Sequence, residues 1–120
     1  MRLITKFTIP GKPVPKGRPR FCKGHTYTPK QTLDAEMKVF VYAHQAIPEG
    51  WVTKGPVELY CRFFFNSNPR TEVEIWESDF AGAIPSGDAD NMVKLVADSL
   101  APFFNDRQIV RLTAEKVGKE

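Results

Sequence analysis

The sequence contains few of the residues from which cysteine-based sites are built. Among its 120 residues there are only two cysteines, Cys22 and Cys61, which are far apart and have no CxxC spacing. Only His25 and His44 could add nitrogen ligands, so no zinc pattern can be composed. Nothing in this pattern indicates a disulfide scaffold. Cys61 lies in an alternating apolar run and is expected to behave as a small core residue.

Long apolar segments are also absent. The N-terminus lacks the apolar stretch of a secretory signal. No apolar run approaches the roughly 20 residues that a membrane-spanning helix requires. We therefore expect a cytoplasmic protein with no membrane partner.

Acidic residues are missing from the first thirty positions, which carry eight Lys or Arg residues. From Asp34 onward acidic residues outnumber basic ones, although the net charge of the whole chain is only +3. Such a one-sided charge distribution favours a polyanionic partner for the N-terminal part. The alternative is a solvated basic surface without a specific partner.

The length and the 42% hydrophobic content fit a single domain covering residues 1–120, for which dimerisation would supply further burial. Alternating patterns predict strands at residues 3–9, 57–65 and 108–117. Periodic patterns predict helices at residues 30–47 and 90–101. The apolar stripe of the first helix consists of Leu33, Met37, Phe40, Val41, His44 and Ile47.

Two segments resist a simple assignment. Residues 11–20 are rich in proline and glycine and are expected to form an extended arm. Residues 71–80 are interpreted either as a short helix or as a loop that orders only in a complex. The order of elements predicts an α+β fold, a small mixed sheet with two main helices packed on it.

The segment Asp88-Ala-Asp-Asn carries the most informative chemistry of the chain. In an extended segment Asp88 and Asp90 would share one face. The following helix runs for about 16 Å, and the next five residues can span roughly 17 Å, so Asp106 can return to the same place. Three close carboxylates repel one another unless a cation neutralises them, and such oxygen ligands suit Mg²⁺. Lys94 would then stabilise the charge on a phosphate.

A simpler interpretation of the acidic segment stays open. Asp88 or Asp90 could cap the N-terminus of the helix, because Asp is a favoured capping residue. Lys94 could be an i,i+4 partner of Asp90 on the helix surface. Neither role alone accounts for three aspartates and a lysine together.

The basic segment predicts a surface that binds the DNA backbone. Its cations supply phosphate contacts. Phe21 and Tyr27 lie between the cations, where they either stack on exposed bases or pack locally. The predicted DNA-binding residues are Lys12, Lys16, Arg18, Arg20, Lys23 and Lys30.

Several motifs together resemble the RusA-like Holliday-junction resolvases, over nearly the whole chain. Relatives of this kind occur in bacterial genomes and prophages. The motifs are Asp88-Ala-Asp-Asn-Met-Val-Lys94, Asp98-Ser-Leu100, Asn105-Asp106-Arg-Gln-Ile-Val110, Gly11-Lys-Pro-Val-Pro-Lys-Gly-Arg-Pro-Arg20 and Tyr27-Thr-Pro29.

The resemblance implies a homodimeric, Mg²⁺-dependent endonuclease, with Mn²⁺ as a substitute, that nicks four-way DNA junctions symmetrically. It places the metal ligands on Asp88, Asp90 and Asp106 and the essential lysine on Lys94. Two alternatives are kept: a metal-dependent nuclease that acts on flaps or other branched DNA, and a DNA-binding protein without catalysis.

The sequence departs from the family pattern at two places. Family members often carry an acidic pair before Gln-Ile, whereas here the first member is Asn105 and the carboxylate is Asp106. The stretch before the first aspartate is often basic, whereas here it contains four acidic residues, which are expected to repel a phosphate backbone. These residues are Glu72, Glu74, Glu77 and Asp79.

Overall fold

A computed structural model describes residues 1–17, 20–53, 55–84, 86–99, 102–105 and 108–114. The chain divides into two compact units, Met1–Asp79 and Phe80–Glu120, and each is described here by itself. Strands and helices both occur, which confirms the predicted α+β class. Within the described ranges, no helix combines the length and the apolar character needed to cross a membrane.

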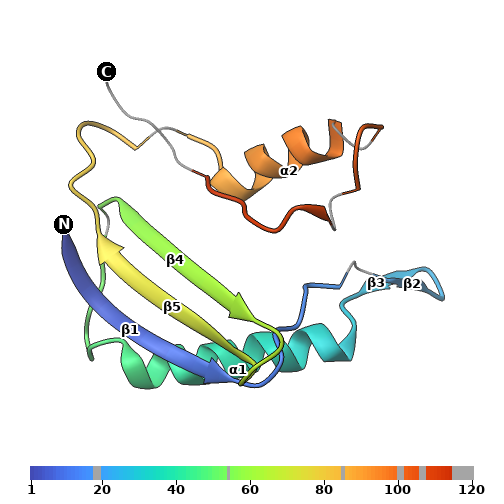
Figure 1. Ribbon diagram of the computed structural model, residues 1–120, viewed down its shortest axis with the longest axis horizontal. Helices are drawn as coiled ribbons and strands as arrows, with labels where there is room; N and C mark the ends of the chain where they lie inside the picture. The colour runs from blue at the N-terminus through green and yellow to red at the C-terminus, as the bar shows by residue number, and fades with distance from the viewer. Residues whose placement is uncertain (18–19, 54, 85, 100–101, 106–107, 115–120) are drawn as a thin grey trace. The chain divides into compact units, whose positions relative to one another are not determined.

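The first unit is built on a three-stranded sheet in the order β1-β5-β4 (Figure 1). Its strands are β1 (Arg2–Pro10), β4 (Val57–Phe64) and β5 (Arg70–Glu77). Both pairings are antiparallel, so the prediction of a mixed sheet is wrong for the described strands. Short connections join β4 to β5, and a hairpin connection of this kind can only produce antiparallel neighbours.

Helix α1 (Lys30–Ala46) lies along one face of this sheet, nearest to β1 (Figure 1). The predicted helix at residues 30–47 is thereby confirmed within one residue. Thr5 faces the helix and donates a hydrogen bond from Oγ1 to the carbonyl oxygen of Ala46 at 2.9 Å. Ile9 and Val73 lie on the same face of the sheet and are buried. These contacts form a thin core between α1 and the sheet.

The central strand β5 occupies a segment for which the sequence predicted a short helix or a loop. Thr71, Val73 and Ile75 alternate with acidic residues, and this period of two is the signature of a strand. Val73 pairs with Phe7 of β1 on one side and with Cys61 of β4 on the other. The prediction is therefore wrong at residues 71–77, because the acidic side chains masked a regular alternation.

The acidic side chains of β5 are engaged within the sheet. The Glu72 carboxylate lies 3.1 Å from Arg70 Nε and 3.6 Å from Arg62 Nη1. Glu77 accepts hydrogen bonds from Trp51 Nε1 at 2.9 Å and Arg2 Nη2 at 2.8 Å, and these two donors hold its pKa below the usual value. Glu72 and Glu77 therefore have local cationic or hydrogen-bonding partners, which reduces the repulsion that they would exert on DNA phosphates.

The apolar stripe predicted on α1 does not form the buried face of the helix. Thr32 is 3% exposed and faces inward, whereas Phe40 is 62% exposed. Leu59 and Phe63 of β4 are also exposed, and the register places them with Val73 on the sheet face that carries α1. Cys61, predicted as a core residue, lies in this same uncovered row and is exposed, although partial burial raises the pKa of its thiol.

The second unit contains helix α2 (Ala89–Ser99), which matches the predicted helix apart from its ends. Residues 100–101, the end of the prediction, lie outside the described residues. The predicted strand at 108–117 is wrong for residues 108–114, which form no strand, and residues 115–117 lie outside the described residues. A strand requires a hydrogen-bonded neighbour, and the described part of this unit offers none.

Candidate functional site

The acidic candidate site lies at the beginning of α2. The carbonyl oxygen of Asp88 accepts the first helical hydrogen bond, from Met92 N at 3.1 Å, so Asp88 occupies the position where the helix begins. Gly87 precedes it with φ +96°, a value that glycine adopts without strain. This turn directs the chain into the helix and fixes the backbone on which the site is built.

Asp90 lies inside the first turn of α2 rather than in an extended segment. Asp88 and Asp90 therefore do not share a face through strand alternation, and the prediction of an extended segment is wrong at Asp90. Asp90 and Lys94 are one helical turn apart, so they project from the same side of α2. Both are exposed. Among the residues that the structure describes, neither forms an ion pair, so the i,i+4 partnership is not formed.

The side chain of Asp88 has a polar partner in the first turn of α2. Its Oδ2 atom accepts a hydrogen bond from Asn91 Nδ2 at 3.3 Å. A carboxylate has about four lone-pair positions, so this contact leaves oxygen lone pairs for a further ligand. Asn91 thus orients the Asp88 carboxylate and leaves its other lone pairs available to bind a cation.

The third predicted carboxylate, Asp106, lies outside the described residues, and so does its neighbour Arg107. The two flanking residues, Asn105 and Gln108, form two reciprocal hydrogen bonds. Gln108 N donates to the carbonyl oxygen of Asn105 at 2.9 Å, and Asn105 N donates to Gln108 Oε1 at 2.7 Å. Asn105, the departure from the family pattern, therefore contributes its backbone N–H and carbonyl oxygen to the contact with Gln108. The described residues alone contain no group of three metal-binding side chains, and the predicted third ligand is not among them.

The N-terminal part of the predicted arm lies against α1. Gly17 N donates to Thr32 Oγ1 at 2.9 Å, and Lys38 Nζ donates to the carbonyl oxygen of Pro10. A Cβ atom at residue 17 would lie 2.9 Å from Thr32 Oγ1 and 3.3 Å from Pro29 Cγ, so the close approach requires glycine. This part of the arm is thus held against α1 near both of its ends.

The predicted DNA-binding cations are in different environments. Lys12 and Lys23 are exposed. Lys16 is exposed as well, but its Nζ lies 3.4 Å from the Glu36 carboxylate. Arg18 lies outside the described residues, and of Arg20 only the backbone, paired with Tyr27, is described.

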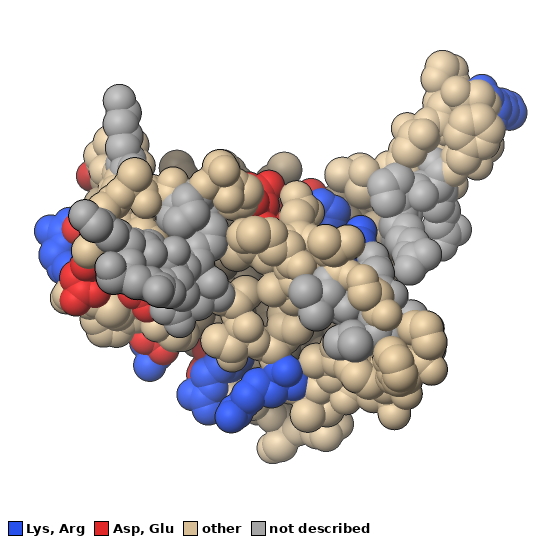
Figure 2. Space-filling view, turned by 90° about the horizontal axis from the view of Figure 1, so that it is seen from above, with Lys and Arg blue, Asp and Glu red and all other residues tan. Residues whose placement is uncertain are grey.

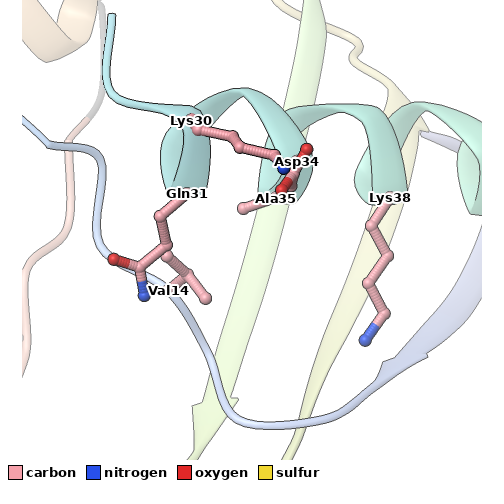
Figure 3. A pocket seen from close by; sticks show the side chains of 6 residues that line it. All are labelled: Val14, Lys30, Gln31, Asp34, Ala35 and Lys38. Atoms are coloured by element: carbon pink, nitrogen blue, oxygen red, sulfur yellow. The ribbon is translucent and has the colours of Figure 1, made fainter.

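Lys30 lines an open hollow between the arm and α1 with a volume of about 480 Å³. Its side chain extends along the helix towards Asp34, whereas the Lys38 side chain projects away from the helix (Figure 3). Lys38, which also lines this hollow, was not among the cations predicted from the sequence. The sequence feature that could have indicated it is the spacing of four residues between Lys30, Asp34 and Lys38, which places all three on one side of a helix.

A β-hairpin follows the arm and was also missed. It consists of β2 (Arg20–Cys22) and β3 (His25–Tyr27). The turn residues Lys23 and Gly24 have φ values of +50° and +78°, the arrangement of a two-residue type I′ turn. The dipeptide Lys23-Gly24 between two short alternating segments was the available signal, although Asn or Asp is more usual before the glycine.

Comparison with known proteins agrees with the motifs. Residues 10–120 match the model of the family described as Endodeoxyribonuclease RusA. The chain is also 32% identical, over 96% of its length, to the uncharacterized protein YqaN of Bacillus subtilis (strain 168), of which the match covers 88%. No solved structure matches the chain significantly. The chain therefore belongs to the RusA family of endodeoxyribonucleases.

Proposed function

We propose that this protein is a magnesium-dependent endonuclease that resolves Holliday junctions by symmetric nicking. The observation that carries the proposal is the group Asp88, Asp90 and Lys94 at the start of α2, in a chain whose family is a family of endodeoxyribonucleases. The family match spans both units. In this proposal the two units act together as one endonuclease domain.

The residues at the start of α2 fit a divalent cation of the Mg²⁺ type. Two exposed carboxylates provide hard oxygen ligands, and Mg²⁺ commonly takes only one or two from the protein while keeping several waters. Asp106 would be the third ligand. When bound, the cation supplies a Lewis acid and a nucleophilic water at neutral pH, and Mn²⁺ would substitute for it.

The other groups of the site act on the charge of the DNA. The Lys94 ammonium, one turn from Asp90, stabilises the negative charge that builds up on the phosphate and on the leaving oxygen. The N-terminal end of α2 contributes a partial positive charge in the same region. Asn91 holds the Asp88 carboxylate in place through its amide. Asp88, Asn91 and Lys94 all belong to the N-terminal end of α2, so the helical backbone fixes the spacing of their Cα atoms.

A panel of labelled DNAs tests the proposal. The protein is incubated with Mg²⁺ and a four-way junction, a flap or a linear duplex. Paired cuts confined to the junction support the proposed function. Cuts on flaps or at single positions would instead support a nuclease for other branched DNA. A junction that is bound, as seen by its retarded migration in a gel, but not cut would indicate a DNA-binding protein. In that case the aspartates would only stabilise the N-terminal end of α2.

The active form in this proposal is a homodimer, because a junction has two strands to cut. Exposed apolar side chains on α1 and β4 support it: Phe40, Leu59 and Phe63 are 62%, 64% and 59% exposed on the same side of the sheet. Exposed apolar side chains that gather on one side of a protein commonly mark an interface. A second copy of the chain would cover these side chains.

The dimer is tested by the mass of the protein in solution and by a charge placed in this apolar row, the name used here for the exposed side chains Phe40 of α1 and Leu59 and Phe63 of β4. The parent protein is expected at about twice the chain mass of 13.6 kDa. Phe40→Glu should weaken self-association by on the order of 100-fold, because it buries an unpaired charge. Val52→Glu is the control, since Val52 is also apolar and 87% exposed but lies in a loop outside this row. Light scattering that gives a single-chain mass for the parent at assay concentrations would contradict the dimer.

The basic segment is proposed to hold the DNA backbone through exposed lysines. Lys12→Ala combined with Lys23→Asn should flatten the dependence of log affinity on log salt by about 0.9 per lost phosphate contact. Asn at position 23 keeps the hairpin turn, because Asn-Gly is the favoured type I′ pair. Lys6→Ala, at an exposed lysine in β1, serves as the control. The measurement is junction affinity across a salt titration, and parallel slopes for double variant and parent would show that these lysines do not touch phosphate.

A further inference from the structure

The hairpin of β2 and β3 has no core of its own. All of its described side chains from Phe21 to Tyr27 are exposed. In Figure 2 the hairpin forms the narrow lobe at the upper right, with Lys or Arg atoms at its end. A two-stranded hairpin in water is marginally stable at best. Burial within the described part of the chain therefore does not explain why the chain forms this element, whereas a binding role would.

Phe21 is the most unusual side chain on the hairpin. It is 75% exposed, although phenylalanine gains much from burial. Within the described part of the chain, its ring stacks on no other ring and carries no cation. The register pairs Phe21 with Thr26, whereas Tyr27 pairs with Arg20. Because neighbouring positions on a strand face opposite ways, Phe21 and Tyr27 project from opposite faces.

The charge around the hairpin identifies the class of its partner. No Asp or Glu precedes Asp34 in the sequence, and Lys23 occupies the turn. A basic, acid-free hairpin that exposes an aromatic ring on each face, Phe21 on one and Tyr27 on the other, is complementary to nucleic acid, in which phosphates accompany stackable bases. Two-stranded ribbons of this kind fit DNA grooves, and apolar side chains can insert between base steps.

We propose that Phe21 inserts at the branch point of the DNA and stacks on a base exposed there. This inference rests on the proposed function and deepens it, because it identifies a residue that distinguishes branched DNA from duplex. In a continuous duplex the ring must first separate stacked bases, which costs free energy. At a branch point the stack is interrupted on one side, so the ring displaces a base from its remaining neighbour at a lower cost. Lys23 contributes charge at the turn but no selectivity.

Binding in EDTA, where no metal-dependent cleavage occurs, tests the inference separately from catalysis. The junction carries 2-aminopurine at the branch point, whose fluorescence rises when the base leaves its stack. The parent protein should produce such a rise. Phe21→Ala should lose it and should bind the junction roughly 5- to 150-fold more weakly, the range for one base–aromatic stack. Its affinity for linear duplex should be unchanged.

Two further variants separate the ring from the hairpin as a whole. Phe21→Trp should keep both the fluorescence rise and the junction affinity, because it retains an aromatic face. Tyr27→Ala removes the aromatic side chain from the opposite face and should keep the fluorescence rise. Equal fluorescence for Phe21→Ala and parent would overturn the inference. So would equal losses of affinity for junction and duplex, which would make Phe21 an ordinary contact.

The outcomes also distinguish this inference from the proposed function. A parent protein that produces the rise but never nicks the junction with Mg²⁺ would contradict the catalytic proposal and leave the role of Phe21 standing. A parent protein that nicks the junction symmetrically without any rise would contradict the role of Phe21 alone.

Discussion

Asp90→Asn is expected to reduce Mg²⁺-dependent junction cleavage by about a thousandfold or more, because loss of a metal ligand removes several kcal/mol of transition-state stabilisation. Junction binding should stay the same or become tighter. The exposed carboxylate in the first turn of α2 repels DNA phosphates, and the amide does not. Single-turnover cleavage rates and EDTA binding curves measure the two effects.

The alternative role of Asp90 has a different signature. A carboxylate that only complements the N-terminal end of α2 contributes about 0.3–1 kcal/mol to stability, and its loss would leave the cleavage rate close to that of the parent. Asp79→Asn is a matched control, because Asp79 is exposed and lies outside the α2 motif. A variant at position 90 that still cuts at the parent rate would refute its assignment as a metal ligand.

Lys94→Ala is expected to lower the turnover rate by about 100- to 1,000-fold, the cost of removing one group that stabilises transition-state charge. Junction affinity should fall much less, since the ammonium acts where the transition state is most negative. Lys94→Arg should recover part of the rate because it keeps the charge. The decisive comparison is single-turnover rate against dissociation constant. Equal losses in both would make Lys94 an ordinary phosphate contact.

The position of the acidic site on α2 could be predicted from the sequence, because it depends on local features. Asp88 begins a helix, and Lys94 follows Asp90 at helical spacing, so short-range geometry places both. The prediction that Asp88 and Asp90 share one face of an extended segment was wrong, because the helix starts at Ala89 and places Asp90 in its first turn. One residue of error at a helix end was enough to change the geometry assumed for the pair.

Two of the features that the sequence did not predict, strand β5 and the buried face of α1, depend on partners that are distant in the sequence. Strand β5 is stabilised by hydrogen bonds to β1 and β4 on either side. The acidic residues around Val73 are typical of a polar loop, but in the sheet Arg62 and Arg70 lie beside Glu72 and balance its charge. The buried face of α1 was likewise decided by contact with β1 rather than by the most apolar stripe. The hairpin was missed because its turn uses Lys23 at positive φ, which is uncommon for lysine.

The most direct test of the central claim is the ligation of cleaved junction products. A four-way junction with a homologous core is incubated with the protein in Mg²⁺ or in EDTA, and DNA ligase is then added to the recovered duplexes. Symmetric nicking predicts two nicked duplexes whose nicks ligase seals, in Mg²⁺ only, with no product from Asp90→Asn. Products with gaps or flaps that ligase cannot seal, or cleavage that persists in EDTA, would contradict a metal-dependent junction resolvase.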